Sequence, residues 1–123
     1  MWQTAIELAV FADDLLVSCG KRLTWAKRDQ LDRASLSVSN NIAEGFERGT
    51  TPDLLKFLYI ARGSAGEVRS MTRLLNRLQR LSGWNAEIHE LGRLAESCSR
   101  QIAAWTRQLQ NSEIKGQRHH QRK

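Results

Sequence analysis

The sequence predicts an all-α protein that folds as an antiparallel, up-down-up-down four-helix bundle. Its 123 residues include one proline, and Ala, Leu, Arg, Gln and Glu, which favour helix, are frequent. Apolar side chains recur at spacings of three and four residues in four separate stretches. Mostly short connections between such stretches favour helices that alternate in direction. The length suits one domain with a core of its own.

We expect the bundle to occupy residues 1–112, followed by a basic, flexible tail over residues 113–123. The expected helices span about residues 2–18, 25–48, 52–82 and 86–111. The last nine residues carry four cationic side chains and no apolar one, which favours disorder.

The second predicted helix has an unusually small inward side. Its stripe consists of Leu31, Ala34, Ser35, Val38, Asn41, Ile42 and Gly45. Small side chains let another helix approach closely, although less apolar area is then buried. Gly49 follows the helix and is a plausible stop.

The third predicted helix begins with the clearest local signal in the chain. Thr51 can cap the helix, Pro52 suits its first position, and Asp53 favours the positive end of the helix dipole. The pattern then continues to about Ser82. Asn85 can cap the fourth helix.

Five arginines share one side of the third predicted helix. With 100° per residue, all five fall within roughly 80° of one another, and no acidic residue lies in that arc. They are Arg62, Arg69, Arg73, Arg77 and Arg80. Such a row favours phosphate binding, because the guanidinium group offers a planar fork to phosphate oxygens. A solvated charged face is the alternative.

The apolar arc of the same helix is too wide for one neighbour. It covers roughly 200°, whereas a surface helix needs about 100°. Its far edge holds Ile60, Ser64, Glu67, Met71, Leu74 and Leu78. We expect this excess to be buried within the bundle or to form an interface between subunits.

The residue types give little support for catalysis or metal binding. Cys19 and Cys98 are expected to be buried, reduced thiols, with a disulfide or metal site as the lesser alternative. His89 is the only histidine outside the tail. No phosphate-binding loop, nucleophile elbow or zinc motif occurs. We therefore expect no enzyme activity, no catalytic residues, no cofactor and no metal.

The chain has no signal peptide pattern and no apolar run long enough to cross a membrane. We therefore expect a cytoplasmic protein without membrane association.

Two sequence blocks resemble one known family. The blocks are Ser37–Gly45, with Asn-Ile-Ala-Glu-Gly at its end, and Phe57–Ser64 followed by Glu67, and the opening Trp2 also fits. They are similar to the four helix bundle proteins, also called 23S rRNA-intervening sequence proteins after ribosomal gene insertions that encode some members. The resemblance runs from Trp2 to about Leu109.

The resemblance implies a ring-like homopentamer without catalytic residues. It also implies relatives that serve as accessory proteins of diversity-generating retroelements and bind a reverse transcriptase and nucleic acid through basic surfaces.

Four polar residues lie on or beside the inward arcs of the second and third helices. They are Asn41, Glu44, Ser64 and Glu67. We expect a satisfied inter-helix polar network in which Glu67 is paired, because an unpaired buried charge is costly. A carboxylate metal site is the minor alternative, because no histidine or third acid has matching spacing.

The functional prediction is a non-enzymatic, homo-oligomeric accessory or scaffold protein that binds RNA or DNA and partners a reverse transcriptase. Its sequence support is the arginine row and the basic tail, in a chain of net charge +6. The alternative is a structural oligomer or a protein-binding adaptor with an acidic protein partner. A small helical ribonuclease fits poorly, because His89 lacks the arginine that such an enzyme carries a few residues before it.

Overall fold

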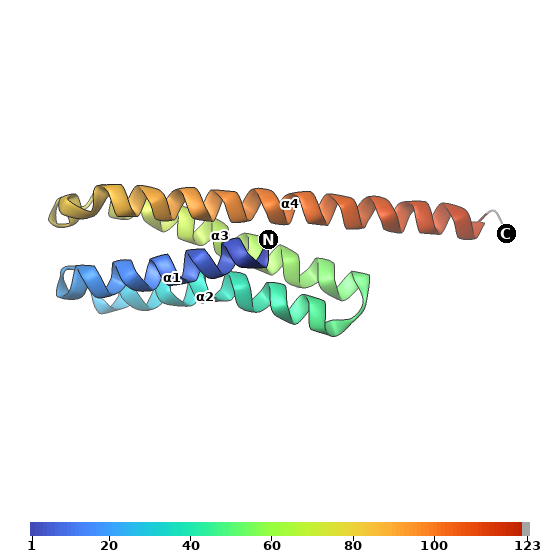
Figure 1. Cartoon of the computed structure of the whole chain (residues 1–123), viewed down its shortest axis with the longest axis horizontal. Coiled ribbons are helices and arrows are strands. Elements are labelled where there is room, and N and C mark those ends of the chain that lie inside the picture. The colour runs from blue at the N-terminus through green and yellow to red at the C-terminus, as the bar shows by residue number, and fades with distance from the viewer. Residues whose placement is uncertain (122–123) are drawn as a thin grey trace.

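The computed structural model describes the backbone of residues 1–121 and the side chains of residues 1–112. This part of the chain confirms the predicted all-α four-helix bundle (Figure 1). The α-helices are α1 (Trp2–Cys19), α2 (Trp25–Arg48), α3 (Thr51–Leu75) and α4 (Asn85–Gln121). Two short 3₁₀ helices, η1 (Gly20–Arg22) and η2 (Gln79–Trp84), lie in the connections.

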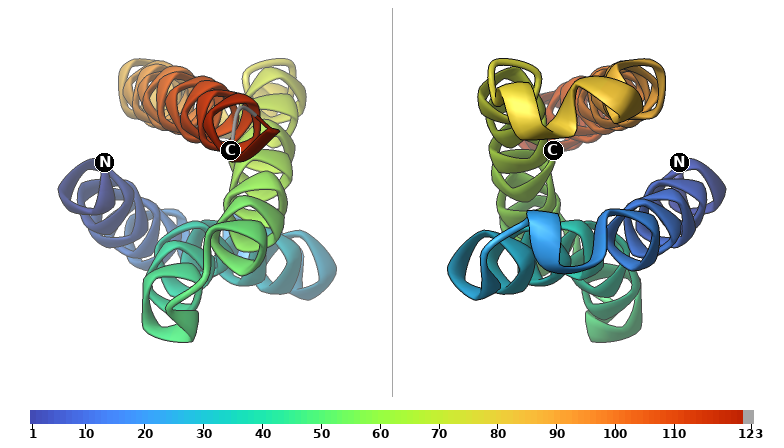
Figure 2. Two further views of the ribbon diagram at one scale, coloured as in Figure 1. Left: turned by 90° about the vertical axis from the view of Figure 1, so that its right-hand side faces the viewer. Right: turned by 90° about the vertical axis from the view of Figure 1, so that its left-hand side faces the viewer.

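Each helix packs against its two neighbours around the bundle (Figure 2). The connections that contain η1 and η2 lie at one end, and the short link between α2 and α3 lies at the other. α1 has 18 residues, against 24 in α2 and 25 in α3. The N-terminus therefore lies part-way along the bundle, whereas α4 extends beyond the other helices (Figure 1).

The core lies along the bundle axis and receives apolar side chains from all four helices. Leu8, Leu31, Leu58 and Leu91 are fully buried there. The small inward side of α2 has the expected effect. A Cβ atom on Gly45 would lie only 3.0 Å from Leu54 Cδ1, so α2 and α3 approach closely at this point.

The link between α2 and α3 follows the local signals with a shift of one residue. Gly49 has a φ of 80°, a conformation that glycine adopts without strain, and it ends α2. Thr50, rather than the predicted Thr51, caps α3, because its hydroxyl accepts a hydrogen bond from the Asp53 N–H over 3.3 Å. The predicted cap was therefore one residue too late.

α3 ends at Leu75, and the prediction that it continues to Ser82 is wrong. The backbone of Leu78 is extended, and η2 then returns the chain toward α4. This path brings Leu81 into the core, where it is fully buried. Asn85 is itself helical, with φ −55° and ψ −39°, and is not a preceding cap.

α4 is helical as far as Gln121, beyond the expected end near residue 111. Its backbone therefore includes most of the predicted tail. The side chains after Ser112 and residues 122–123 lie outside the described part of the chain, so the flexibility predicted for residues 113–123 stays a prediction.

Candidate nucleic-acid interface

Three of the five predicted arginines lie on the side of α3 that borders α4. Arg69 and Arg73 line a groove between these two helices. Arg62 precedes Arg69 by seven residues, which returns a side chain to within about 20° of the same direction. Arg69 is partly buried, and Arg62 and Arg73 are exposed.

The other two predicted arginines lie beyond the end of α3 and do not continue its row. Arg77 follows the helix, and Arg80 is part of η2. The Nε group of Arg80 donates a hydrogen bond to the carbonyl oxygen of Arg22 over 2.7 Å. Arg80 therefore joins the two connections at one end of the bundle, a role that a uniform helical wheel does not reveal.

α4 contributes arginines that the sequence analysis missed. Arg93 lines the same groove as Arg69 and Arg73, and together with Glu90 it also lines a hollow between α1 and α4. Arg100 and Arg107 follow it at intervals of seven residues and so keep its direction along the helix. The repeat of Arg93, Arg100 and Arg107 opposite that of Arg62 and Arg69 was the available signal.

We call these side chains of α3 and α4 the basic face. The basic face consists of Arg62, Arg69, Arg73, Arg93, Arg100 and Arg107. Its groove has a volume of about 250 Å³. The groove is lined by Arg69, Thr72, Arg73, Asn76, His89, Gly92, Arg93 and Glu96.

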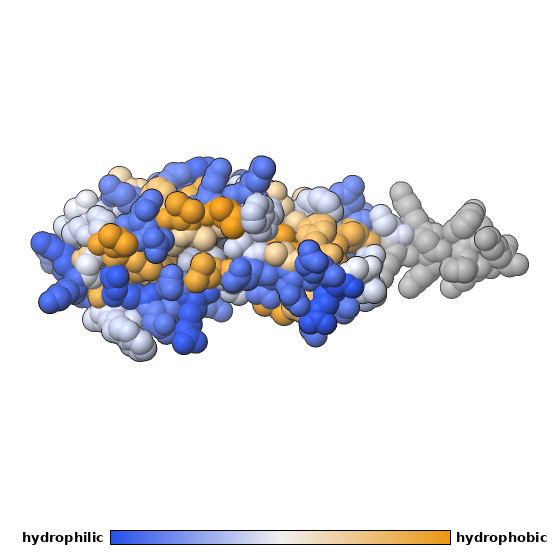
Figure 3. All heavy atoms as spheres, turned by 60° about the horizontal axis from the view of Figure 1, so that its bottom comes forward, coloured by the Kyte–Doolittle hydropathy of each residue, from blue (hydrophilic) through white to orange (hydrophobic). Residues whose placement is uncertain are grey.

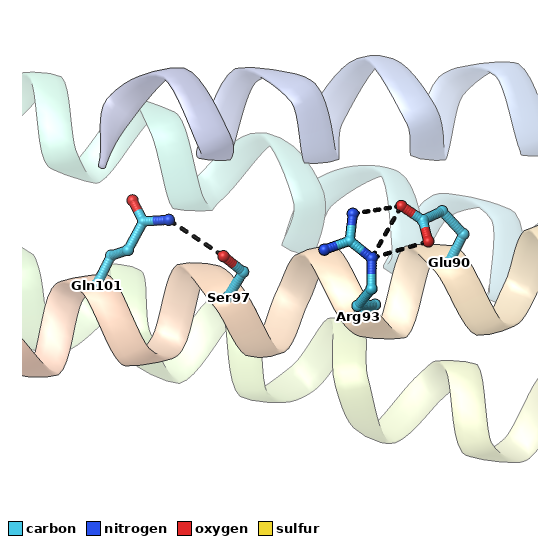
Figure 4. Close-up of polar contacts among 4 residues, drawn as sticks. All are labelled: Glu90, Arg93, Ser97 and Gln101. Carbon is cyan, nitrogen blue, oxygen red and sulfur yellow. Dashed lines mark hydrogen bonds and ion pairs between the residues drawn. The ribbon is translucent and has the colours of Figure 1, made fainter.

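Two of the six arginines are paired with acidic residues of α4. Arg93 donates to both carboxylate oxygens of Glu90, with a shortest distance of 2.5 Å (Figure 4). This hydrogen bonding lowers the pKa of the Glu90 carboxyl and raises the pKa of Arg93. Arg100 pairs with Glu96 at 2.8 Å.

The remaining four arginines make no ion pair with the described side chains. They are Arg62, Arg69, Arg73 and Arg107. Their guanidinium groups keep their donors available for an external anion, and phosphate oxygens suit that geometry.

A glycine sets the spacing of the two arginine rows. A Cβ atom on Gly92 of α4 would lie 2.9 Å from the Thr72 hydroxyl oxygen of α3. The hydroxyl is itself fixed, because it donates to the carbonyl oxygen of Arg69 over 2.7 Å. The close approach of α3 and α4 therefore depends on the missing side chain at residue 92.

The predicted inter-helix network forms with different members. The Ser64 hydroxyl donates to the Ser37 hydroxyl over 2.8 Å, which joins α3 to α2. The Asn41 amide donates to the carbonyl and hydroxyl oxygens of Ser37, each over 2.8 Å. Ser37, which the sequence analysis did not select, is the centre of this network.

Glu44 and Glu67 lie outside that network, which corrects the expectation for both carboxylates. Glu44 is exposed and pairs with Arg48 one turn along α2 at 3.0 Å. Glu67 is exposed on α3 and has no hydrogen bond or ion pair with the described side chains. The helical wheel placed both carboxylates on or beside the inward arcs of α2 and α3. In the structure they lie at the outer edges of these arcs, where water solvates them.

A further polar contact joins α4 to the beginning of α1. The Gln101 amide donates to the hydroxyl oxygens of Thr4, over 3.0 Å, and Ser97, over 3.1 Å. Figure 4 shows Ser97 and Gln101 on the same helix as the Glu90–Arg93 pair. This contact fixes the N-terminal part of α1 against the middle of α4.

Both cysteines are free thiols buried in the core, as predicted. Burial raises the pKa of both thiols, and it raises that of Cys98 to about 11. Among the described side chains, no three His, Cys, Asp or Glu residues lie close enough together to hold a metal ion.

Each helix in the described part of the chain is too short or too polar to cross a lipid bilayer. No curated protein and no solved structure matches the chain. A family model described as 23S rRNA-intervening sequence protein matches residues 1–104, which agrees with the two sequence blocks and with the bundle fold. The chain therefore belongs to the 23S rRNA-intervening sequence protein family.

Proposed function

We propose that the protein is a non-enzymatic, homo-oligomeric accessory or scaffold protein that binds RNA or DNA through the basic face. The observation that carries the proposal is the pair of arginine rows on α3 and α4. Four of these arginines have no acidic partner among the described side chains. Phosphate contacts of this kind provide most sequence-independent affinity for nucleic acid.

The distribution of charge supports the same side of the molecule. Residues 1–49, with α1 and α2, hold seven acidic and six basic side chains. Residues 50–112, with α3 and most of α4, hold five acidic and nine basic ones. A polyanion therefore approaches the α3–α4 side more favourably than the α1–α2 side.

Exposed apolar side chains on other sides of the bundle support self-association. Ile60 and Leu74 on α3 are 43% and 46% exposed, so the wide arc of this helix is only partly used within one chain. Val17 and Trp25, near one end of α1 and α2, are 72% and 77% exposed. Figure 3 shows several apolar patches on the side of the molecule that faces the viewer. Such patches mark interaction sites.

The resemblance supports two finer parts of the proposal, a homopentamer and a reverse transcriptase partner. A cytoplasmic location is a further part of the proposal. A pentamer repeats the basic face, so that weak phosphate contacts add by multivalency.

The test is a triple substitution of Arg62, Arg69 and Arg73 by Gln. This change removes three charges, keeps helix propensity and breaks no ion pair among the described side chains. We expect a folded protein of unchanged mass whose affinity for RNA or DNA is greatly reduced. The slope of log K against log salt should fall by about 2 to 3, because each lost phosphate contact contributes about 0.7 to 0.9.

The control replaces Lys21, Lys27 and Arg33 by Gln, which removes the same charge from η1 and α2 and breaks only the exposed Arg33–Asp29 pair. If both triple variants bind more weakly than the parent and to the same extent, only net charge matters and the basic face is not the interface. If neither variant differs from the parent at any salt concentration, a structural oligomer or an adaptor for an acidic protein is the better description. The exposed Val17 and Trp25 favour that second function.

A further inference from the structure

One aromatic side chain lies at the end of the basic face. Tyr59 of α3 is 45% exposed, and its hydroxyl accepts a hydrogen bond from the amide of Gln110 of α4. The side chain therefore spans the same pair of helices that carry the two arginine rows. It is also the only tyrosine in the chain.

The position of Tyr59 relative to the arginines follows from helical spacing. Arg62 lies three residues after Tyr59 on α3, and Arg107 lies three residues before Gln110 on α4. Residues three apart are neighbours on a helix surface. The ring is therefore flanked by an arginine of each row, and both arginines are free of ion pairs with the described side chains.

The hydrogen bond uses only the hydroxyl and leaves much of the ring open to solvent. Because the hydroxyl is held by α4, the ring is already oriented before any ligand arrives. A pre-oriented ring loses little conformational entropy when a ligand binds. An exposed aromatic ring beside arginines is the combination that single-stranded nucleic acid uses, with bases on the ring and phosphates on the cations.

We propose that the basic face binds single-stranded nucleic acid and that Tyr59 stacks against an unpaired base. The inference rests on the proposed function and names its substrate class. In a duplex the bases are already stacked on one another, so the ring has no free base to receive. Between Tyr59 and Arg73 the helix rises roughly 21 Å, which gives room for several nucleotides.

The direct experiment observes the ring in the unmodified protein. Because Tyr59 is the only tyrosine in the sequence, selective ¹³C labelling of tyrosine gives signals from this ring alone. Addition of an unstructured single strand should move the Tyr59 ring signals upfield, because a stacked base shields them. The same strand without bases, and a duplex of equal length, should leave the ring signals in place. Equal shifts with all three ligands, or no shift with the single strand, would overturn the proposal.

Substitutions separate stacking from a structural clamp. Tyr59→Leu removes the ring, whereas Tyr59→Phe and Gln110→Ala remove only the hydrogen bond. We expect Tyr59→Leu to weaken single-strand binding roughly 5- to 100-fold and duplex binding less than about twofold. The other two variants should stay within about threefold of the parent for both ligands. If all three variants lose single-strand affinity equally, Tyr59 acts only as a clamp and the proposal fails.

The basic face and the stacking of Tyr59 can be disproved separately. Loss of affinity in the triple arginine variant, together with an unmoved Tyr59 ring signal, would keep the basic face as the interface and remove the single-strand assignment. Unchanged affinity in the triple variant would remove the proposed function itself.

Discussion

At the scale of single residues, the glycines show how much the surroundings of a position matter. Gly66 and Gly92 both lie within helices, where glycine is unfavourable relative to alanine. A Cβ atom on Gly66 would meet no atom within 4 Å, whereas one on Gly92 would meet the Thr72 hydroxyl at 2.9 Å. The first glycine is therefore replaceable, and the second is required by the packing of α3 on α4.

This contrast gives a matched pair of stability predictions. Gly92→Ala should lower the free energy of unfolding by about 1–2 kcal/mol, because overpacking forces α3 and α4 apart or rotates Thr72. Gly66→Ala should raise it by up to about 1 kcal/mol through helix propensity. Urea titrations followed by circular dichroism measure both. Equal effects of the two changes would show that the contact at Thr72 relaxes without cost.

The buried thiols give a prediction for the alkaline range. The unfolded Cys98 thiol ionises near the ordinary pKa of 9.0, whereas the folded thiol stays neutral until about pH 11. Raising the pH through this window favours the unfolded state, so the stabilising contribution is present below pH 9 and lost as the pH approaches 11.

The parent should therefore lose stability between pH 9 and pH 11 more steeply than Cys98→Ala does. Cys19→Ala should alter this slope less, because the charge of Arg28 opposes the effect of burial on the Cys19 pKa. Urea midpoints measured across this range provide the comparison. If the stability of the parent and of Cys98→Ala falls with pH at the same rate, the raised pKa of Cys98 is contradicted.

At the scale of elements, the ends of helices depend on contacts that lie far apart in the chain. Arg28 of α2 illustrates this. Its Nη1 group donates to the carbonyl oxygens of Leu16 and Gly20 over 2.7 and 2.8 Å. A cation at the C-terminus of α1 also complements the helix dipole. One side chain thus caps the C-terminal end of α1 and attaches it to α2.

We expect Arg28→Gln to lower the free energy of unfolding by about 1–3 kcal/mol, because two carbonyl groups lose a charged donor. Arg33→Gln on the same helix is the control, since Arg33 is exposed and forms only a surface pair with Asp29. It should change stability by about 0.5 kcal/mol or less. A thermal midpoint that falls equally in both variants would count against a capping role for Arg28.

Local sequence patterns predicted α1 and α2 closely but missed the end of α3. Apolar spacing and Gly49 determine the limits of α2, because these signals are local. Between Leu75 and Gly83 no glycine or proline interrupts the pattern. The helix ends there because the chain has to turn, bury Leu81 and reach α4, and these are tertiary requirements that override propensity.

The distinction between local signals and tertiary requirements also explains which parts of the candidate site could be predicted from the sequence. A helical wheel placed Arg62, Arg69 and Arg73 on one side of a helix, and this part is seen in the structure. It could not show that α4 adds a second row, because the neighbour of a helix is set by topology. It also could not separate Ser64, which is buried, from Glu67, which lies at the exposed edge of the same arc.

At the scale of the whole molecule, α3 separates two kinds of surface. The basic face lies on its side toward α4. Ile60, Glu67 and Leu74 follow one another at intervals of seven residues on a different, exposed side. An assembly that buries this second side leaves the basic face open, so oligomerisation and nucleic-acid binding are compatible.

We therefore expect Leu74→Glu to lower the mass of the assembly in sedimentation experiments at micromolar concentration while helix content is retained. The introduced charge would lose its hydration at the interface, which is costly. Asn40→Glu, at an exposed position of α2, should leave the mass unchanged. A parent protein that sediments as a single chain would contradict the homo-oligomer.

The composition of the basic face has a consequence for chemical modification. All six of its cationic residues are arginines, whereas the nearest lysine in the sequence is Lys56. Acylation neutralises the amine of lysine and does not affect guanidinium groups. Acetylating enzymes and amine-directed reagents would therefore alter other parts of the molecule and leave the charge of this surface intact.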